Sequence, residues 1–127
     1  IAMSTIANAI SNLSDVASNP AIVMNKATYA SFKAVQAAAS YGYDPFENLP
    51  VIFNNSIKAY SVASTGDTYA IVGDFAEGAL ANFPNGEDIT IKFDDMSLAE
   101  ADLVKIVGRQ FVAMEVIAPN AFVKISK

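Results

Sequence analysis

The stretch AIVMNKATYASF, residues 21–32, decides the fold class of this chain. Its first four residues are apolar and are bounded by turn residues, which predicts a short buried strand. Asn25 comes next, and an asparagine side chain in this position accepts a hydrogen bond from a free amide in the first turn of a helix. A helix is therefore expected from Lys26 to about Ser40, directly after the strand.

Apolar residues at helical spacing predict two helices near the start of the chain. Before the strand, residues 4–18 carry one apolar stripe, formed by Ile6, Ile10, Leu13 and Ala17. After Asn25, one helix face carries Tyr29, Phe32, Val35 and Ala39. We interpret Tyr29 and Phe32 as core residues rather than as a platform for a ligand, because large aromatic side chains contribute strongly to protein cores.

The rest of the chain is rich in strand patterns. Strands are predicted at residues 51–53, 68–73, 79–83, 88–94 and 104–118. Asn85-Gly86 lies between the third and fourth of these runs, and this dipeptide favours the turn of a β-hairpin that would pair them. Residues 54–67 are polar and end in a turn signal, and only a part of them is compatible with a strand.

Alternation assigns the faces of these strands. Every second residue of the run 88–94 is apolar, so Ile89, Ile91 and Phe93 are expected to face the core. In the run 104–118 the even-numbered positions are nearly all apolar and are expected to be core as well. Between the two runs, Ser97 and Glu100 fit a capping box that opens about one turn of helix.

Together these patterns predict an α+β fold in which two N-terminal helices cover one face of a mixed, mainly antiparallel sheet. The 127 residues suffice for a single domain, residues 1–127. Hydrophobic residues make up 53% of the chain, which favours an ordered core over disorder. The first residue is Ile1 rather than methionine, so we expect a piece of a longer protein.

The composition disfavours several classes of function. Histidine and cysteine are both absent, which removes the commonest general base, the commonest metal ligand and any disulfide. The net charge of -5 disfavours binding to the phosphates of nucleic acids. No apolar run approaches the roughly 20 residues of a membrane span. The first residues lack the basic start and apolar block of a secretory signal.

Two groups of residues resemble known binding loops, but each lacks a required part. Gly73 and Gly78 are spaced as in a phosphate-binding loop, yet the lysine and the serine or threonine that must follow the second glycine are missing. We therefore expect a turn there. The densest acidic group lacks the alternating oxygens and central glycine of a calcium loop, so we expect solvated carboxylates. It consists of Asp94, Asp95, Glu100 and Asp102.

Two further groups of side chains were candidates for chemistry or contact. Ser56 and Lys58 would share a strand face and could form a serine-lysine nucleophile, but nothing else in the sequence supports one. We predict no catalytic, cofactor-binding or metal-binding residue. Tyr41, Tyr43 and Phe46 cluster in a proline-containing loop. They are equally compatible with a surface for another chain and with packing onto the core.

The order of several motifs resembles one protein family. The motifs are Met24-Asn25 with Thr28, then Asn48–Ile52, Ala70–Phe75, Gly108–Phe111 and Ala118–Ile125. In this order they resemble the C-terminal part of tailed-phage major capsid proteins with the Hong Kong 97-like coat fold. The resemblance implies the axial domain plus the returning C-terminal strands of a coat subunit. The arm, extended loop and spine helix of that family have no counterpart here, and no crosslinking residue carries over.

The resemblance implies a structural role for a phage or prophage protein. The full-length protein is expected to self-assemble into pentamers and hexamers of an icosahedral shell, in the cytoplasm of a bacterial host. We expect the protein to bind no cofactor, no small-molecule ligand, no specific nucleic acid and no membrane. Phe122, Val123 and Ile125 are expected to pack under a helix or onto the long strand.

Loops are the expected contact surfaces, because a rigid sheet presents them outward. The predicted assembly contacts lie in the polar stretch 54–67, where deletion of residues 61–66 is expected to spare the fold. They are Asn54, Asn55, Ser61, Ser64, Thr65 and Asp67. The alternative is a non-enzymatic ligand-binding or adhesion module of a bacterial protein, which predicts a concave pocket. A small hydrolase is a third reading, and it predicts a carboxylate with a strongly shifted pKa in a cleft.

Overall fold

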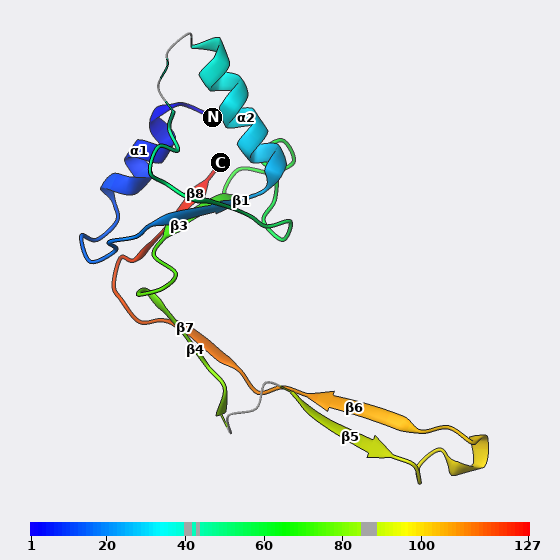
Figure 1. Ribbon diagram of the computed structural model, residues 1–127. Helices are drawn as coiled ribbons and strands as arrows, with labels where there is room; N and C mark the ends of the chain where they lie inside the picture. The colour runs from blue at the N-terminus through cyan, green and yellow to red at the C-terminus, as the bar shows by residue number, and fades with distance from the viewer. Residues whose placement is uncertain (40–41, 43, 85–88) are drawn as a thin grey trace. The chain divides into compact units, whose positions relative to one another are not determined.

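The computed structural model describes residues 1–39, 42, 44–84 and 89–127 (Figure 1). The chain forms two compact units. The first comprises Ile1–Ala79 together with Val116–Lys127, and the second comprises Leu80–Glu115.

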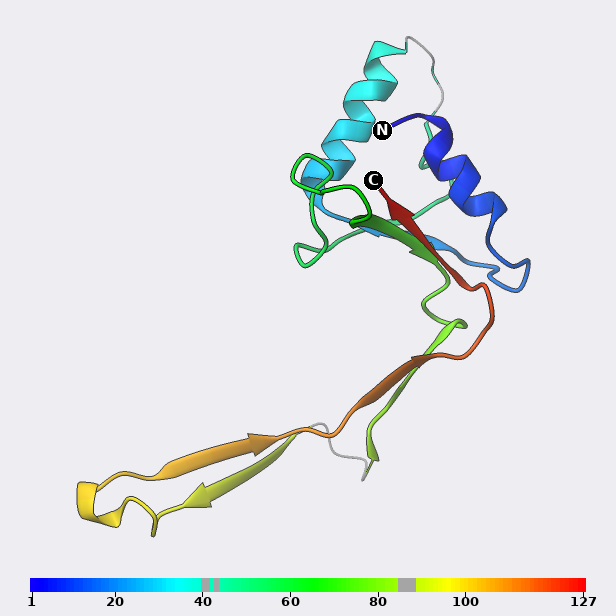
Figure 2. The same cartoon turned by 180° about the vertical axis from the view of Figure 1, so that it is seen from behind.

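The first unit is built on a four-stranded sheet with the strand order β2-β1-β3-β8. Its strands are β1 (Ala21–Met24), β2 (Val51–Phe53), β3 (Thr68–Gly73) and β8 (Phe122–Ser126). β1 pairs in parallel with β2, whereas β3 pairs antiparallel with both β1 and β8. Two helices, α1 (Ser4–Ser11) and α2 (Lys26–Ala38), lie over the same face of this sheet (Figures 1 and 2). The predicted α+β class, with a mixed and mainly antiparallel sheet, is confirmed.

The core of this unit lies between the sheet and the helices. The register places Met24 opposite Ala70, and Ala70 opposite Ile125, so these side chains share a face of the sheet. Phe32 on α2 is fully buried against them. Phe46 is also buried and meets Phe32 edge to face, with ring centroids 5.7 Å apart. The question left open for the aromatic loop is therefore settled for Phe46 as core, while Tyr41 and Tyr43 lie outside the described residues.

The first helix is shorter than its apolar stripe predicts. α1 ends at Ser11 instead of residue 18, and Ile10 is 41% exposed. The side chains of Ser11 and Asn12 both donate to the carbonyl oxygen of Asn8, at 2.8 and 2.9 Å. Short polar side chains that bond to nearby backbone in this way compete with helix hydrogen bonds, which explains the early end.

The second helix begins as predicted. The Oδ1 atom of Asn25 accepts a hydrogen bond from the amide of Ala27 at 3.0 Å, so Asn25 is the N-cap. The helix ends at Ala38, and the expected last residue, Ser40, lies outside the described residues. Among the residues that the structure describes, no helix is both long and apolar enough to cross a membrane.

The strand that closes the chain is tied into the sheet of the first unit. β8 pairs along β3, and Ile125 is buried. Part of α1 lies against β8, which confirms the expectation of packing under a helix for Val123 and Ile125. It is wrong for Phe122, which alternates to the other face of the sheet and meets Phe75 edge to face, with ring centroids 5.1 Å apart. In the sheet, β8 lies beside β3 and not beside the predicted long strand, so the first of the two expected alternatives describes this strand.

The strands of the second unit pair as two-stranded sheets, and the strands that pair with each other are not the ones predicted. β5 (Thr90–Asp94) pairs antiparallel with β6 (Lys105–Arg109). β4 (Ala79–Asn82) pairs with β7 (Ala113–Val116), not with β5. The predicted hairpin between the third and fourth runs is therefore wrong, and its turn, Asn85-Gly86, lies outside the described residues. The predicted long strand 104–118 is two strands, β6 and β7, separated by residues 110–112.

The predicted capping box is also wrong. The short 3-10 helix η2 (Ala99–Ala101) has Leu98 at its N-cap, and no side chain caps it. Ser97 instead bonds to Asp94 through both its amide, at 3.1 Å, and its hydroxyl. Asp94 also accepts the amide of Met96 at 3.0 Å, so this carboxylate organises the turn after β5 and draws Ser97 away from the helix start.

Candidate functional site

The loop of residues 54–67, which joins β2 to β3, contains all six predicted contact residues. It is built from turns and contains no strand, so the part of it that was compatible with a strand is not one. Five of the six side chains are exposed and the sixth, Asp67, is half-buried. Val62 is 71% exposed as well, which places an apolar side chain among these polar ones.

The first half of the loop is fixed by hydrogen bonds to the end of β1 and the start of α2. The amide of Asn54 donates to the carbonyl oxygen of Met24 at 3.0 Å. The Nδ2 atom of Asn25 donates to the carbonyl oxygen of Ile57 at 3.3 Å. The amide of Tyr60 donates to the hydroxyl of Thr28 at 3.0 Å.

The second half of the loop is held by Asp67 and by Lys127. The carboxylate of Asp67 accepts a hydrogen bond from the ammonium group of Lys58 at 2.8 Å and another from the amide of Ser64 at 2.9 Å. These two bonds, the Lys58 bond first, hold the pKa of Asp67 below its ordinary value. Gly66 donates its amide to the carbonyl oxygen of Lys127 at 2.8 Å. The loop thus has a fixed backbone and outward side chains.

Two expectations about this loop need correction. Ala63 is buried in the core, so a deletion of residues 61–66 would remove a core side chain and is expected to destabilise the fold. Ser56 lies in a turn and Lys58 follows it outside any strand, so the two side chains do not share the strand face that a serine-lysine pair would need. Lys58 is instead bonded to Asp67.

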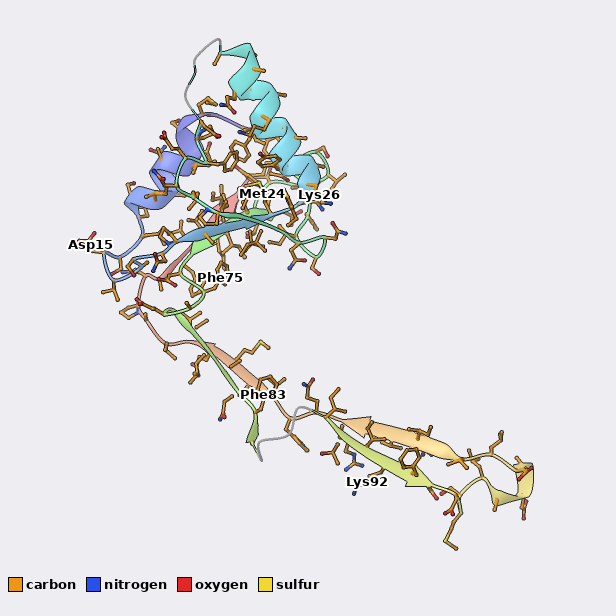
Figure 3. The ribbon with its side chains drawn as sticks, in the orientation of Figure 1. Asp15, Met24, Lys26, Phe75, Phe83 and Lys92 are labelled. Atoms are coloured by element: carbon orange, nitrogen blue, oxygen red, sulfur yellow. The ribbon has the colours of Figure 1, made fainter. Side chains whose placement is uncertain are left out.

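The second unit has a strongly apolar strand face that is exposed. In an antiparallel pair, directly opposed residues project from the same face, and Phe93 is opposite Ile106 while Ile91 is opposite Gly108. Phe93 is 71% exposed, Ile106 64% and Ile91 57%. The other face carries polar residues, including Lys92, which Figure 3 labels on β5.

The expectation that these apolar side chains face the core is therefore wrong for the described chain. Ala118, at the end of the predicted long strand, is half-buried, but Ile89 and the large apolar residues at even positions of that strand are exposed. These even-numbered residues are Val104, Ile106, Val112, Met114 and Val116. The reason is physical, because alternation tells which residues share a face but not whether a second layer covers it.

The two glycines that resemble a phosphate loop have a structural explanation. Gly73 and Gly78 are both buried, and a Cβ atom at Gly73 would lie 2.7 Å from the carbonyl oxygen of Ala121. A Cβ atom at Gly78 would lie 2.7 Å from the Cβ of Ala121. Between them, the carboxylate of Asp74 accepts the amides of Ala76 and Glu77, at 3.0 and 3.1 Å. The expected turn is present, and it is closely packed.

The acidic group of the second unit lies around the end of β5 and the helix η2. Within residues 1–39, 42, 44–84 and 89–127, no group of three or more His, Cys, Asp or Glu side chains is placed to hold a metal ion. The carboxylate of Asp94 is engaged by Ser97 and Met96, and these hydrogen bonds, the Ser97 hydroxyl first, lower its pKa.

Sequence reasoning missed the role of Asn25 and Thr28 in holding the loop. The sequence indicated only that Asn25 caps a helix, and a cap uses the side-chain oxygen alone. The amide nitrogen of the same side chain is free to bond elsewhere, and it reaches Ile57. A threonine in the first turn of a helix gives no sequence signal of a distant backbone partner.

Two comparisons with known proteins find a match for the chain. The model of the phage capsid family matches residues 1–127. A solved structure described as the capsid of an empty GTA particle, computed with C5 symmetry, has a similar fold, with a TM-score of 0.74 at 17% sequence identity. That match covers 100% of this chain but 45% of the GTA capsid chain, so this chain spans less than half the length of the related one.

No curated protein matches the chain in sequence. The family model, by contrast, extends over every residue, and the likeness to the GTA capsid agrees with it in fold. The chain belongs to the phage capsid family.

Proposed function

We propose that this chain is part of the coat subunit of a phage or prophage, which assembles with its own copies into capsomers of an icosahedral shell. The observation that carries the proposal is the family match over the whole chain. The similar fold of the GTA capsid chain supports it. Within such a subunit, we assign the chain to the axial domain plus the returning C-terminal strands.

The proposed role is structural, not catalytic, and its partners are other copies of the subunit in pentamers and hexamers. Its proposed location is the virion capsid, after assembly in the bacterial host cytoplasm. Family membership favours this role over a ligand-binding or adhesion module and over a hydrolase. The exposed apolar face formed by Ile91, Phe93 and Ile106 also supports it, since large exposed apolar surfaces mark contacts with other protein chains.

We propose the loop 54–67 as one surface that touches a neighbouring copy. Its exposed polar side chains and the exposed Val62 offer both hydrogen-bonding and apolar contact. Its backbone is bonded at many points, so the surface exists before a neighbour arrives. Many such contacts, each weak, add up over the copies of a shell.

The loop is tested by adding bulk and charge without touching its buried parts. In the full-length subunit, the double change Ser61→Arg and Thr65→Arg alters two exposed side chains and leaves Ala63 in place. We expect an unchanged melting temperature of the free subunit and a loss of most closed shells, because two cations would be buried without partners at each contact. Sedimentation and electron microscopy measure the shells.

The matched control is Ala7→Arg, at an exposed position of α1 outside the loop, which should leave assembly unchanged. Shells as numerous as those of the unaltered subunit, formed by the doubly changed protein, would remove the loop from the set of contacts. They would leave the coat function itself standing.

A further inference from the structure

Three residues of a single short motif bond to the loop 54–67 at regular intervals. Met24, Asn25 and Thr28 are bonded to Asn54, Ile57 and Tyr60 respectively, through the three hydrogen bonds of 3.0, 3.3 and 3.0 Å. The motif lies where β1 passes into α2, and Figure 3 labels Met24 at the end of the strand and Lys26 at the start of the helix.

The chemistry of Asn25 exceeds what a helix cap requires. Its Oδ1 atom accepts the amide of Ala27, and Asp, Ser or Thr would serve that purpose equally well. An ionised Asp has no donor, and Ser or Thr has only the hydroxyl that does the capping, whereas Asn has a separate donor, Nδ2, which bonds to the carbonyl oxygen of Ile57. The residue therefore joins the start of α2 to the loop.

Thr28 makes the second side-chain connection. The residue is completely buried, and its hydroxyl accepts the amide of Tyr60 across 32 positions of sequence. Serine and threonine hydroxyls inside helices often bond back to the preceding turn of their own helix. Here the hydroxyl serves a distant backbone amide, which would otherwise lose its partner in a half-buried place.

We propose that Met24, Asn25 and Thr28 form an anchor that holds residues 54–60 in their docking shape before the subunit meets a second copy of itself. An ordered surface binds better than a disordered one, because the entropy of ordering is lost during folding and not again at each contact. The docking part of this inference rests on the proposed function. The anchoring part does not.

Thr28→Val tests the anchor, because valine has nearly the shape of threonine and no hydroxyl. In the unassembled full-length subunit, the amide of Tyr60 should exchange its hydrogen about tenfold faster or more. Amides of β3, which lie outside the anchor, should keep their rates. Thr28→Ser retains the hydroxyl and should bring the exchange of Tyr60 back toward that of the unaltered protein.

Asn25→Asp provides a second, independent variant. It keeps the oxygen that caps α2 and removes the donor to Ile57, so the helix should persist while residues 54–60 exchange faster. This variant carries the test if Thr28→Val fails to fold. Faster exchange confined to residues 54–60, with fewer closed shells in electron micrographs, is the expected result.

The outcomes separate the anchor from the proposed function. Unchanged exchange of residues 54–60 in both variants would overturn the anchor, whatever happens to assembly. Faster exchange with undiminished shells would overturn the docking part, because the shape of the loop would then not matter to the contact. A full-length unaltered subunit that never forms shells would count against the coat function and leave the exchange result valid.

Discussion

Asp74 shows how one buried carboxylate organises the backbone around it. The residue is 1% exposed and accepts three backbone amides, from Asn19 at 3.3 Å, Ala76 at 3.0 Å and Glu77 at 3.1 Å. The bond from Glu77 is the main cause that lowers the pKa of Asp74, burial acts in the opposite direction, and the bonds from Asn19 and Ala76 lower it further. The charged form of Asp74 therefore stabilises the fold.

The pH dependence of stability follows from this lowered pKa. The ordinary aspartate pKa is 3.8, so Asp74 contributes stability above that value and loses it as the pH falls through the lower pKa of the folded state. Asp74→Asn should lower the melting temperature at neutral pH and flatten its decline below about pH 4. Thermal unfolding followed by circular dichroism from about pH 2 to pH 7 measures both.

The control for this prediction is Asp15→Asn, at an exposed position. This variant should leave the dependence of the melting temperature on pH unchanged in shape. Asp44, Asp67 and Asp94 also have lowered pKa values, so the decline should persist in part without Asp74. A curve for Asp74→Asn that runs parallel to that of the unaltered protein would contradict the assignment.

At the scale of secondary-structure elements, two phenylalanines of the same chemistry have opposite environments. Phe32 on α2 is completely buried, whereas Phe93 on β5 is 71% exposed. Phe32→Ala should lower the free energy of unfolding by about 3–5 kcal/mol, because it removes a core ring and leaves a cavity. Phe93→Ala should lower it by less than about 1 kcal/mol in the unassembled subunit.

Urea unfolding of the two variants measures this contrast. The tyrosines of the first unit, such as Tyr69, provide a fluorescence signal near the core. If Phe93→Ala were as harmful as Phe32→Ala, the face of β5 that carries Phe93 would be covered within the free subunit. The sequence prediction that Phe93 is core would then hold.

The same contrast explains which elements could be predicted from sequence. β1 with its capped helix was predictable, because an apolar run, a cap residue and a helical stripe are all local signals. The pairing of β5 with β6 was not, since Ile91 and Phe93 alternate equally well beside any partner strand. The early end of α1 was missed because the bonds of Ser11 and Asn12 to Asn8 compete with an otherwise good stripe.

At the scale of the whole molecule, the two units should differ in their protection from hydrogen exchange. The first unit has a sheet covered by helices, whereas β5 and β6 form a two-stranded sheet with exposed apolar side chains. Isolated two-stranded sheets are marginally stable in water. Amides of β5 and β6 should therefore exchange about 100-fold faster than those of β1 and β3 in the unassembled subunit.

Mass spectrometry of deuterium uptake checks this expectation on free subunits and on shells. In shells, the uptake of β5 and β6 should fall toward that of β1, because on the proposed function a neighbouring copy covers their exposed apolar face. Equal uptake of the two units in free subunits would contradict it.

The exposure of the loop 54–67 was predictable from the sequence, but the way its backbone is held was not. A polar loop between two strands is a common contact surface, and the exposure of Asn54, Ser61 and Thr65 agrees with that expectation. What holds the loop in shape depends on Asn25 and Thr28, 32 positions earlier than their partners Ile57 and Tyr60. Such distant pairings become visible only after the sheet and helix are built.

The backbone of the loop 54–67 is held by hydrogen bonds to β1 and α2. Its exposed side chains can therefore be replaced without changing the rest of the fold. On the proposed function, exchanging the side chains at Ser61, Ser64 and Thr65 should alter which copies the surface accepts, while Thr28 and Asn25 keep the backbone course. Two variants of one coat protein that differ only at these three side chains should then, when mixed, assemble into separate shells, each with its own kind.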